Sequence, residues 1–339
     1  MLSLAASTLS YSTPHVTVEE HMSDVKPFEL ISSMINGNKS STWTATVPTR
    51  FDNLAAVKQL CGTFPLEEKD RLPEREALAA MDLPDTFDAR TQWPKCSVIS
   101  TVRDQSACGS CWAFGSTEAF EDRRCVATGE DVEFSSDDTA GCCSGFACGL
   151  SMGCNGGQPS AALNWMCKTG VVTGGDYTDI GKGGSCKPYE FAPCAHHVDP
   201  SPQYPACPSS EYSLKCSKSC SESGYGKSYA DDKAKCSKAF SVRGEQQIMQ
   251  ALYQEGPLAV AFTVYSDFPT YKSGVYQHQS GSALGGHAVE MIGWGTENGT
   301  PYWLIKNSWN DQWGDKGTFK ILRGSNECGI EGDVSGVSF

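Results

Sequence analysis

The chain has 339 residues, 39% of them hydrophobic, which is enough for a sizeable core in one large unit or two domains. Its 40 acidic and 27 basic residues give a net charge of −13, which argues against a nucleic-acid partner. No stretch reaches the roughly 18 consecutive apolar residues of a membrane helix, so we expect no membrane partner either.

Residues 1–82 differ in composition from the rest of the chain. They contain a single cysteine, Cys61, and end in the charged stretch LEEKDRLPEREALAAMDLP, after which the cysteine-dense region begins. We interpret 1–82 as a leader and prosegment and 83–339 as a mature domain. Composition alone leaves an ordinary N-terminal subdomain open as the alternative.

The chain contains 17 cysteines, most of them between Cys96 and Cys236, without a repeated C-x2-C spacing. Disulfides formed in an oxidising compartment explain this density better than a metal, so we expect no metal and no cofactor. An odd count leaves at least one thiol unpaired. The glycosylation sequons at Asn38 and Asn298 fit a secretory route, and we expect a lysosomal, vacuolar or secreted protein.

The stretch DQSACGSCWAF places Cys108 and Cys111 close together in the sequence. From the residues alone the pair could be a redox dithiol, half of a zinc site, or a structural sulfur beside a nucleophile. The following WAFGSTEAFEDRRC predicts a helix over about 112–125, with Phe114 and Phe120 on one face and charged residues opposite. Cys111 would then lie at the helix N-terminus, where its thiolate is stabilised.

Two further helices are predicted later in the chain. PSAALNWMCKTG should end at Gly170, and EQQIMQALYQEGP should end at Gly256 and Pro257. The region 181–240 is rich in Gly, Pro and Ser, and this composition predicts loops joined by disulfides.

The C-terminal third predicts strands at GHAVEMIGW, PYWLIKNSW and GTFKILR, with a hairpin turn at Asn298-Gly299. In this hairpin His287 and Asn307 fall at the same open end, so an Asn307 oxygen can accept a hydrogen bond from the imidazole. Helices followed by an antiparallel sheet indicate an α+β chain of two subdomains. Gln105, shortly before Cys111, can donate to a developing oxyanion.

The motifs CGSCWAF, GGHAVEMIGWG and IKNSWNDQWGDKG together resemble the papain family of cysteine proteases. The resemblance implies a papain-like fold, with a helical domain, an antiparallel barrel-like domain, an active-site cleft between them and an inhibitory prosegment containing LCGTF. It also implies roles for individual residues: Cys111 as nucleophile, His287 as acid and base, Asn307 as its orienting partner, Gln105 as oxyanion donor, Trp309 as a shield over the His–Asn bond, and Gly156, Gly157 and Gly286 as backbone sites for substrate.

The segment CKPYEFAPCAHHVDPSPQYPACP, residues 186–208, resembles the occluding loop of the cathepsin B group of that family. This implies that His196 and His197 bind a substrate's C-terminal carboxylate, so the enzyme would release dipeptides as well as cleave internally. A plain surface loop and a metal-binding pair remain alternatives. Asp333 falls where the group has an acidic residue at the base of a specificity pocket.

The same resemblance implies the disulfides Cys96–Cys125, Cys108–Cys154, Cys142–Cys216, Cys143–Cys148, Cys186–Cys220 and Cys194–Cys207. A Cys167–Cys236 bond is a guess, and Cys61 and Cys328 are left over. The expected partners are peptide and protein substrates, the chain's own prosegment and cystatin-like inhibitors, with the protein a monomer. The alternative function is a catalytically silent, disulfide-rich binding protein.

Two positions depart from the family pattern. Ser106 follows the oxyanion glutamine where the family usually has glycine, which affects the geometry of that loop. Of the two ion pairs that latch the occluding loop, Asp104 and His196 preserve one, whereas Gln312 replaces an aspartate of the other. We therefore expect a loop that opens more readily.

Overall fold

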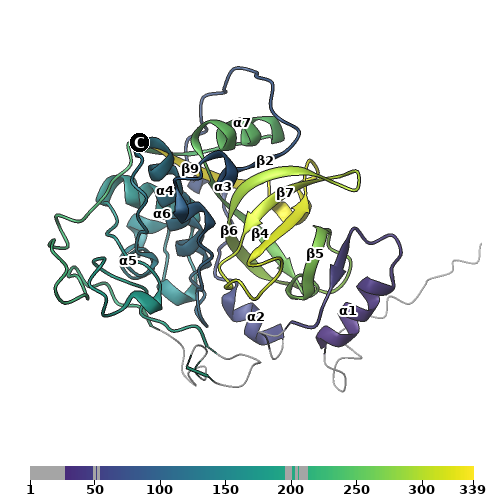
Figure 1. The fold of residues 1–339 in the computed structure, drawn as a ribbon, viewed down its shortest axis with the longest axis horizontal. Helices are drawn as coiled ribbons and strands as arrows, with labels where there is room; N and C mark the ends of the chain where they lie inside the picture. The colour runs from purple at the N-terminus through teal and green to yellow at the C-terminus, as the bar shows by residue number, and fades with distance from the viewer. Residues whose placement is uncertain (1–26, 49–50, 52–53, 195–200, 203–204, 206–212) are drawn as a thin grey trace, which may run out of the picture.

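In the computed structural model the described residues are 27–48, 51, 54–194, 201–202, 205 and 213–339. The helices are α1 (Pro27–Gly37), α2 (Leu54–Leu60), α3 (Ala89–Gln92), α4 (Cys111–Thr128), α5 (Ser136–Cys142), α6 (Pro159–Thr169) and α7 (Glu245–Glu255). The strands are β1 (Trp43–Ala45), β2 (Phe87–Asp88), β3 (Lys238–Ser241), β4 (Leu258–Tyr265), β5 (Tyr271–Tyr276), β6 (Ala283–Glu297), β7 (Thr300–Lys306), β8 (Thr318–Leu322) and β9 (Asp333–Ser338). Figure 1 shows α4, α5 and α6 on one side and the sheet on the other.

The strands form one sheet in the order β1-β5-β8-β7-β6-β4-β9-β3, with β2 paired to β6. All pairs are antiparallel except β5 with β8. The β6–β7 hairpin turns at Asn298 and Gly299, whose φ angles of 50° and 82° suit a tight hairpin turn. The predicted α+β class and this hairpin are therefore confirmed.

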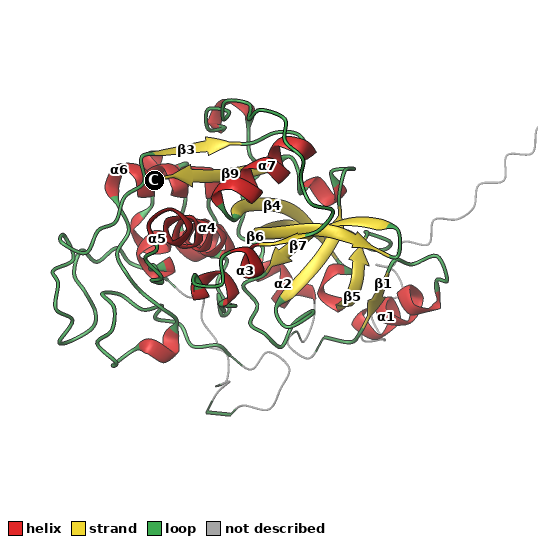
Figure 2. Cartoon of the chain, turned by 45° about the horizontal axis from the view of Figure 1, so that its top comes forward, coloured by secondary structure: helices red, strands yellow, loops and turns green. Residues whose placement is uncertain are grey.

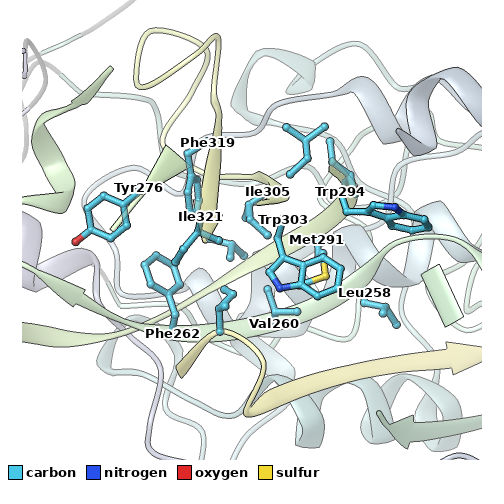
Figure 3. Close-up of a cluster of buried hydrophobic side chains, with 14 of the residues drawn as sticks. Leu258, Val260, Phe262, Tyr276, Met291, Trp294, Trp303, Ile305, Phe319 and Ile321 are labelled. Atoms are coloured by element: carbon cyan, nitrogen blue, oxygen red, sulfur yellow. The ribbon is translucent and has the colours of Figure 1, made fainter. Parts of the chain in front are cut away.

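The inner face of the sheet forms the larger core, which Figure 3 shows. It buries the side chains Leu258, Val260, Phe262, Tyr276, Met291, Trp294, Trp303, Ile305, Phe319 and Ile321. Most of these belong to strands β4, β6, β7 and β8, where alternate residues point to the same side. This packing holds β6 and β7 in place and so fixes the positions of the residues at their ends.

The helical side has its own core around α4, whose predicted ends are close to those observed. The expectation of a charged outer face on this helix was wrong, because Glu118, Glu121, Asp122 and Arg123 are all buried. The helix lies in the middle of the molecule, against α6 on one side and against β6 on the other (Figure 2). At Gly115 the helix approaches so closely that a Cβ would lie 3.1 Å from the Val289 backbone.

The segment before residue 83 packs on the sheet and then crosses to the helical side. Strand β1 extends the sheet beside β5, with the Trp43 ring 5.0 Å from that of Tyr276. Helix α2 buries Val57 and Leu60 and packs against β6. In Figure 1 it lies below the sheet. This placement brings the residues after Leu60 to the N-terminal end of α4.

The structure forms five of the six disulfides that the resemblance implied, and also the guessed Cys167–Cys236 bond. The five are Cys96–Cys125, Cys108–Cys154, Cys142–Cys216, Cys143–Cys148 and Cys186–Cys220. Cys207 lies outside the described residues, and so does its predicted bond to Cys194. Cys61, Cys111 and Cys328 carry free thiols. Within the described ranges, none of the helices is both long and apolar enough to span a bilayer.

Candidate active site

Cys111 is the first residue of α4, after the N-cap residue Ser110, and is fully buried. Burial alone would raise the pKa of its thiol, but the His287 imidazole and the Thr63 hydroxyl outweigh burial and lower the pKa. The partial positive charge of the helix N-terminus also favours a thiolate. Cys108 is in a disulfide with Cys154, so the structure excludes a Cys108–Cys111 redox dithiol in this state.

His287 lies on β6 opposite Phe262 of β4 and is fully buried. Its Nε2 lies 2.8 Å from Oδ1 of Asn307, the residue directly after β7. This bond fixes the ring, and the imidazole also acts on the Cys111 thiol, whose pKa it lowers by its charge and by hydrogen bonding. The Trp309 ring packs against the imidazole, with centroids 4.8 Å apart and an angle of 35° between the ring planes, and both side chains are fully buried.

Gln105 presents its side-chain amide to the same region. Its Nε2 donates to the Cys108 carbonyl at 2.8 Å and to the Leu60 carbonyl at 3.0 Å, while its Oε1 accepts from Ser308 Oγ at 2.8 Å. Ser308 therefore fixes which way the amide points. The amide donor is occupied by a peptide carbonyl from the segment before residue 83.

This segment crosses the site in extended form just after α2. The Gly62 N–H and the Thr63 hydroxyl each lie 3.3 Å from the Cys111 sulfur. Backbone bonds join Thr63 to Gly286 and join both Gly62 and Phe64 to Gly157, at 2.8–3.0 Å. The Thr63–Gly157 bridge is parallel and the Thr63–Gly286 bridge is antiparallel. Two of the three glycines expected to bind substrate backbone, Gly157 and Gly286, thus bind this segment's backbone.

Close approach explains why glycine occurs on both sides of this contact. A Cβ on Gly62 would overlap the carbonyl oxygen of Gly109, and a Cβ on Gly157 would overlap the Trp112 ring. Gly156 has a φ of 107° and lies against the Phe64 ring. A side chain at Gly62 or Gly156 would therefore push the crossing segment away from the site, whereas one at Gly157 would clash with Trp112 beneath it.

Asp333 begins β9, opposite Ala261 of β4. Burial raises the pKa of its carboxyl to about 6, and the Arg71 guanidinium partly opposes this rise. Arg71 also donates to the Gly332 carbonyl at 2.8 Å. A basic side chain of the N-terminal segment therefore lies near Asp333, the acid that the family resemblance assigns to a specificity pocket.

His196 and His197 lie outside the described residues. The base of their loop is described, and Ala192 and Tyr189 contact the loop that carries Gln105.

Several contacts at the site were missed by the sequence reasoning. Two of them involve the Gln105 side-chain amide, which donates to the Leu60 carbonyl and accepts from the Ser308 hydroxyl. The others join the 105–110 loop to Tyr189 and to the Ala192 carbonyl. The LCGTF motif indicates that this segment belongs to an inhibitory prosegment, but local sequence patterns do not reveal which backbone atoms of distant segments form hydrogen bonds.

Comparison of the chain with known proteins identifies its family. Residues 83–338 match the family described as papain family cysteine protease. The chain belongs to this family. Within it the chain is similar to the cathepsin B-like proteins, and it carries a prosegment as the zymogens of the family do.

Two curated relatives come from Caenorhabditis elegans. Cathepsin B-like cysteine proteinase 5 is 51% identical over 256 residues, covering 74% of this chain and 72% of the relative. Cathepsin B-like cysteine proteinase 4 is 43% identical over 318 residues, covering 92% of each chain. The solved structure of proCathepsin B S9 from Trypanosoma congolense has a TM-score of 0.77 at 30% identity and covers 91% of this chain and 97% of that chain.

Proposed function

We propose that the chain hydrolyses peptide bonds with Cys111 as nucleophile and His287 as acid and base. The observation that carries the proposal is that one short stretch of the prosegment contacts both the proposed nucleophile, Cys111, and the proposed oxyanion donor, Gln105. The Leu60 carbonyl accepts from Gln105, and the Gly62 N–H donates to the Cys111 sulfur. Residues 60–62 thus offer the peptide groups that a bound substrate would offer.

In the proposed reaction the Cys111 thiolate forms a bond to the scissile carbonyl carbon, and the oxygen takes up the negative charge. Gln105 Nε2 and the Cys111 backbone N–H donate to this oxygen. The His287 imidazolium gives its proton to the leaving amine as the C–N bond breaks. A water that gives a proton to His287 then attacks the thioester carbon, and breaking of the C–S bond releases the carboxylic acid and restores the Cys111 thiolate and the His287 imidazolium. Asn307 keeps the ring oriented throughout.

The prosegment fits an inhibitor of this reaction. Its backbone pairs with Gly157 in the parallel direction, and we propose that substrate runs the opposite way. Phe51 of the prosegment also packs edge-on against Trp309, with ring centroids 5.1 Å apart. Removal of the prosegment opens both the oxyanion donor and the sulfur to substrate.

We further propose that the enzyme releases C-terminal dipeptides, with His196 and His197 as the carboxylate-binding pair. The support is the sequence of the 186–208 loop and the contacts of the loop base with the oxyanion loop. A charged carboxylate at a fixed distance from the scissile bond would be recognised by protonated imidazoles.

The test compares one peptide with a free and with an amidated C-terminus, using the acid-processed enzyme. We expect dipeptide release from the free acid to be at least about tenfold faster, a difference of about 1.4 kcal/mol. His196→Ala combined with His197→Ala should remove this preference and leave internal cleavage intact. Equal rates for the two peptides would refute dipeptide release, while loss of both activities would show only a misfolded loop variant.

We also propose an acidic compartment of the secretory pathway, or the exterior, as the place of action. The six disulfides among the described residues need an oxidising route. Fractionation of the source cells with an antibody to the mature domain tests this, and a purely cytosolic signal would contradict it.

A further inference from the structure

Ser106 has a backbone conformation that normally selects glycine. Its φ is 56°, in the left-handed region, and its side chain is fully buried. This region disfavours residues that carry a Cβ. Ser106 directly follows the oxyanion donor Gln105, so its conformation sets the path of the loop that presents this donor.

The Ser106 hydroxyl contacts the inserted loop. Its Oγ donates to the carbonyl of Ala192 at 2.5 Å, and its backbone N–H donates to Asp104 Oδ1 at 2.7 Å. Ala192 belongs to the loop base that follows Cys186, whose disulfide to Cys220 fixes the start of that loop. Glycine at position 106 could adopt the same φ but could not make the bond to Ala192.

A second contact joins the same two segments. Tyr189 is buried, and its hydroxyl donates to the Gln105 carbonyl at 3.1 Å and lies 3.0 Å from Ser110 Oγ. Its ring packs edge-on against Phe114 of α4 at 4.8 Å. Residues 189–192 thus contact the loop 105–110 at three points, all within the stretch that leads into Cys111.

We propose that Ser106 is a positioning residue for peptide hydrolysis, whose hydroxyl fixes the oxyanion loop on the base of the inserted loop and so holds Gln105 Nε2 where the oxyanion forms. This rests on the proposed function above. An oxyanion donor is effective only if it is fixed before the charge develops. A small displacement of such a donor raises the free energy of the transition state and so lowers kcat, but it changes substrate binding little.

The test uses Ser106→Ala and Ser106→Gly in the acid-processed enzyme. Both remove the hydroxyl, but only glycine also removes the steric cost of the positive φ. Three quantities are measured: kcat and KM on a peptide amide, and the rate of Cys111 alkylation by iodoacetamide, a displacement that forms no oxyanion. We expect kcat to fall about tenfold in both variants, with KM and alkylation little changed.

Ser223→Ala, an exposed serine in the same disulfide-rich region, is the matched control and should leave all rates unchanged. Unchanged kcat in both Ser106 variants overturns the proposal. A kcat that falls in Ser106→Ala but not in Ser106→Gly would assign the loss to backbone strain. An alkylation rate that falls as much as kcat would assign the loss to the Cys111 thiolate. Either result also overturns the proposal. If the parent enzyme itself neither hydrolyses peptides nor is alkylated at Cys111, the proposed function fails instead.

Discussion

At the scale of single residues, the site combines a buried sulfur with hydrogen-bond donors that are fixed in advance. The Asn307 oxygen fixes His287, and the Ser308 hydroxyl fixes Gln105, so neither side chain needs to reorganise when charge develops. The prosegment uses the same donor for the Leu60 carbonyl. Inhibition and the proposed catalysis therefore depend on one amide.

This shared use gives a prediction for Gln105→Ala. We expect kcat on a peptide amide to fall roughly 10²- to 10³-fold with a small change in KM, as for loss of one oxyanion donor. Steady-state kinetics of the processed enzyme measures this. Gln246→Ala, an exposed position on α7, is the control. A Gln105→Ala enzyme with parental kcat would exclude Gln105 as a donor.

The residues of the site were largely predictable, and so was the His287–Asn307 hydrogen bond, but most of the other contacts were not. Cys111, His287 and Asn307 were found because a hairpin brings strand ends together and a helix start favours a thiolate. The role of Ser106 was visible only as a departure from glycine. Its partner Ala192 lies far along the chain, and no local pattern connects the two.

At the scale of elements, the ends of α6 and α7 followed from glycines that stop a helix. Both helices end where predicted, before Gly170 and Gly256. The burial of the charged face of α4 could not be predicted from periodicity, because its partner Lys306 comes from β7. The addition of β1 to the sheet was missed for a similar reason, since the strand has three residues and pairs with the distant β5.

The prosegment crossing yields a prediction about latency. Gly62→Ala places a Cβ against the Gly109 carbonyl, and such overpacking typically costs about 1–3 kcal/mol. We expect the unprocessed Gly62→Ala chain to hydrolyse a small fluorogenic peptide roughly 10- to 100-fold faster than the unprocessed parent. Rates are read at neutral pH before any shortening appears on a gel.

The matched control is Gly37→Ala at the end of α1, where a Cβ would meet no atom within 4 Å. This variant should remain as latent as the parent. If Gly62→Ala is equally latent, the crossing segment is not what blocks Cys111.

At the scale of the whole molecule, a buried charge cluster joins the helical side to the sheet. Lys306 Nζ lies 2.7 Å from Glu290 and 3.5–3.6 Å from Asp122 and Glu118, and all four side chains are almost completely buried. Three carboxyls thus share one ammonium group. Burial raises the pKa of Glu118 to about 7, although Lys306 opposes this, and burial also raises the pKa values of Glu290 and Asp122.

The sign of the pH effect follows from these shifts. A carboxyl whose pKa is higher in the folded state than in the unfolded state binds its proton more tightly in the fold. For Glu118 this stabilisation is complete below its ordinary pKa of 4.5 and is lost as pH rises through about 7. The cluster therefore favours the fold in acid and weakens it near neutrality.

We predict that Glu290→Gln reduces this pH dependence. In a Cys111→Ser background, which prevents self-digestion, the drop in Tm between pH 5 and pH 7.5 should shrink by roughly 1–2 °C for about 1 kcal/mol. Glu297→Gln, whose carboxylate pairs with Lys320 at 2.8 Å near the surface, is the control. An identical drop in parent and Glu290→Gln would show that the cluster does not control the pH dependence.

Hydrolysis by this protein should depend on the Cys111 thiolate, and titration with an epoxysuccinyl peptide decides whether it does. Acid-processed enzyme is treated with increasing inhibitor, and residual hydrolysis and the labelled residue are measured together. We predict that activity falls linearly to zero at one equivalent, with label on Cys111 and none on Cys328, whose thiol pKa is raised by burial. Hydrolysis that persists after complete labelling of Cys111 would exclude Cys111 as the nucleophile.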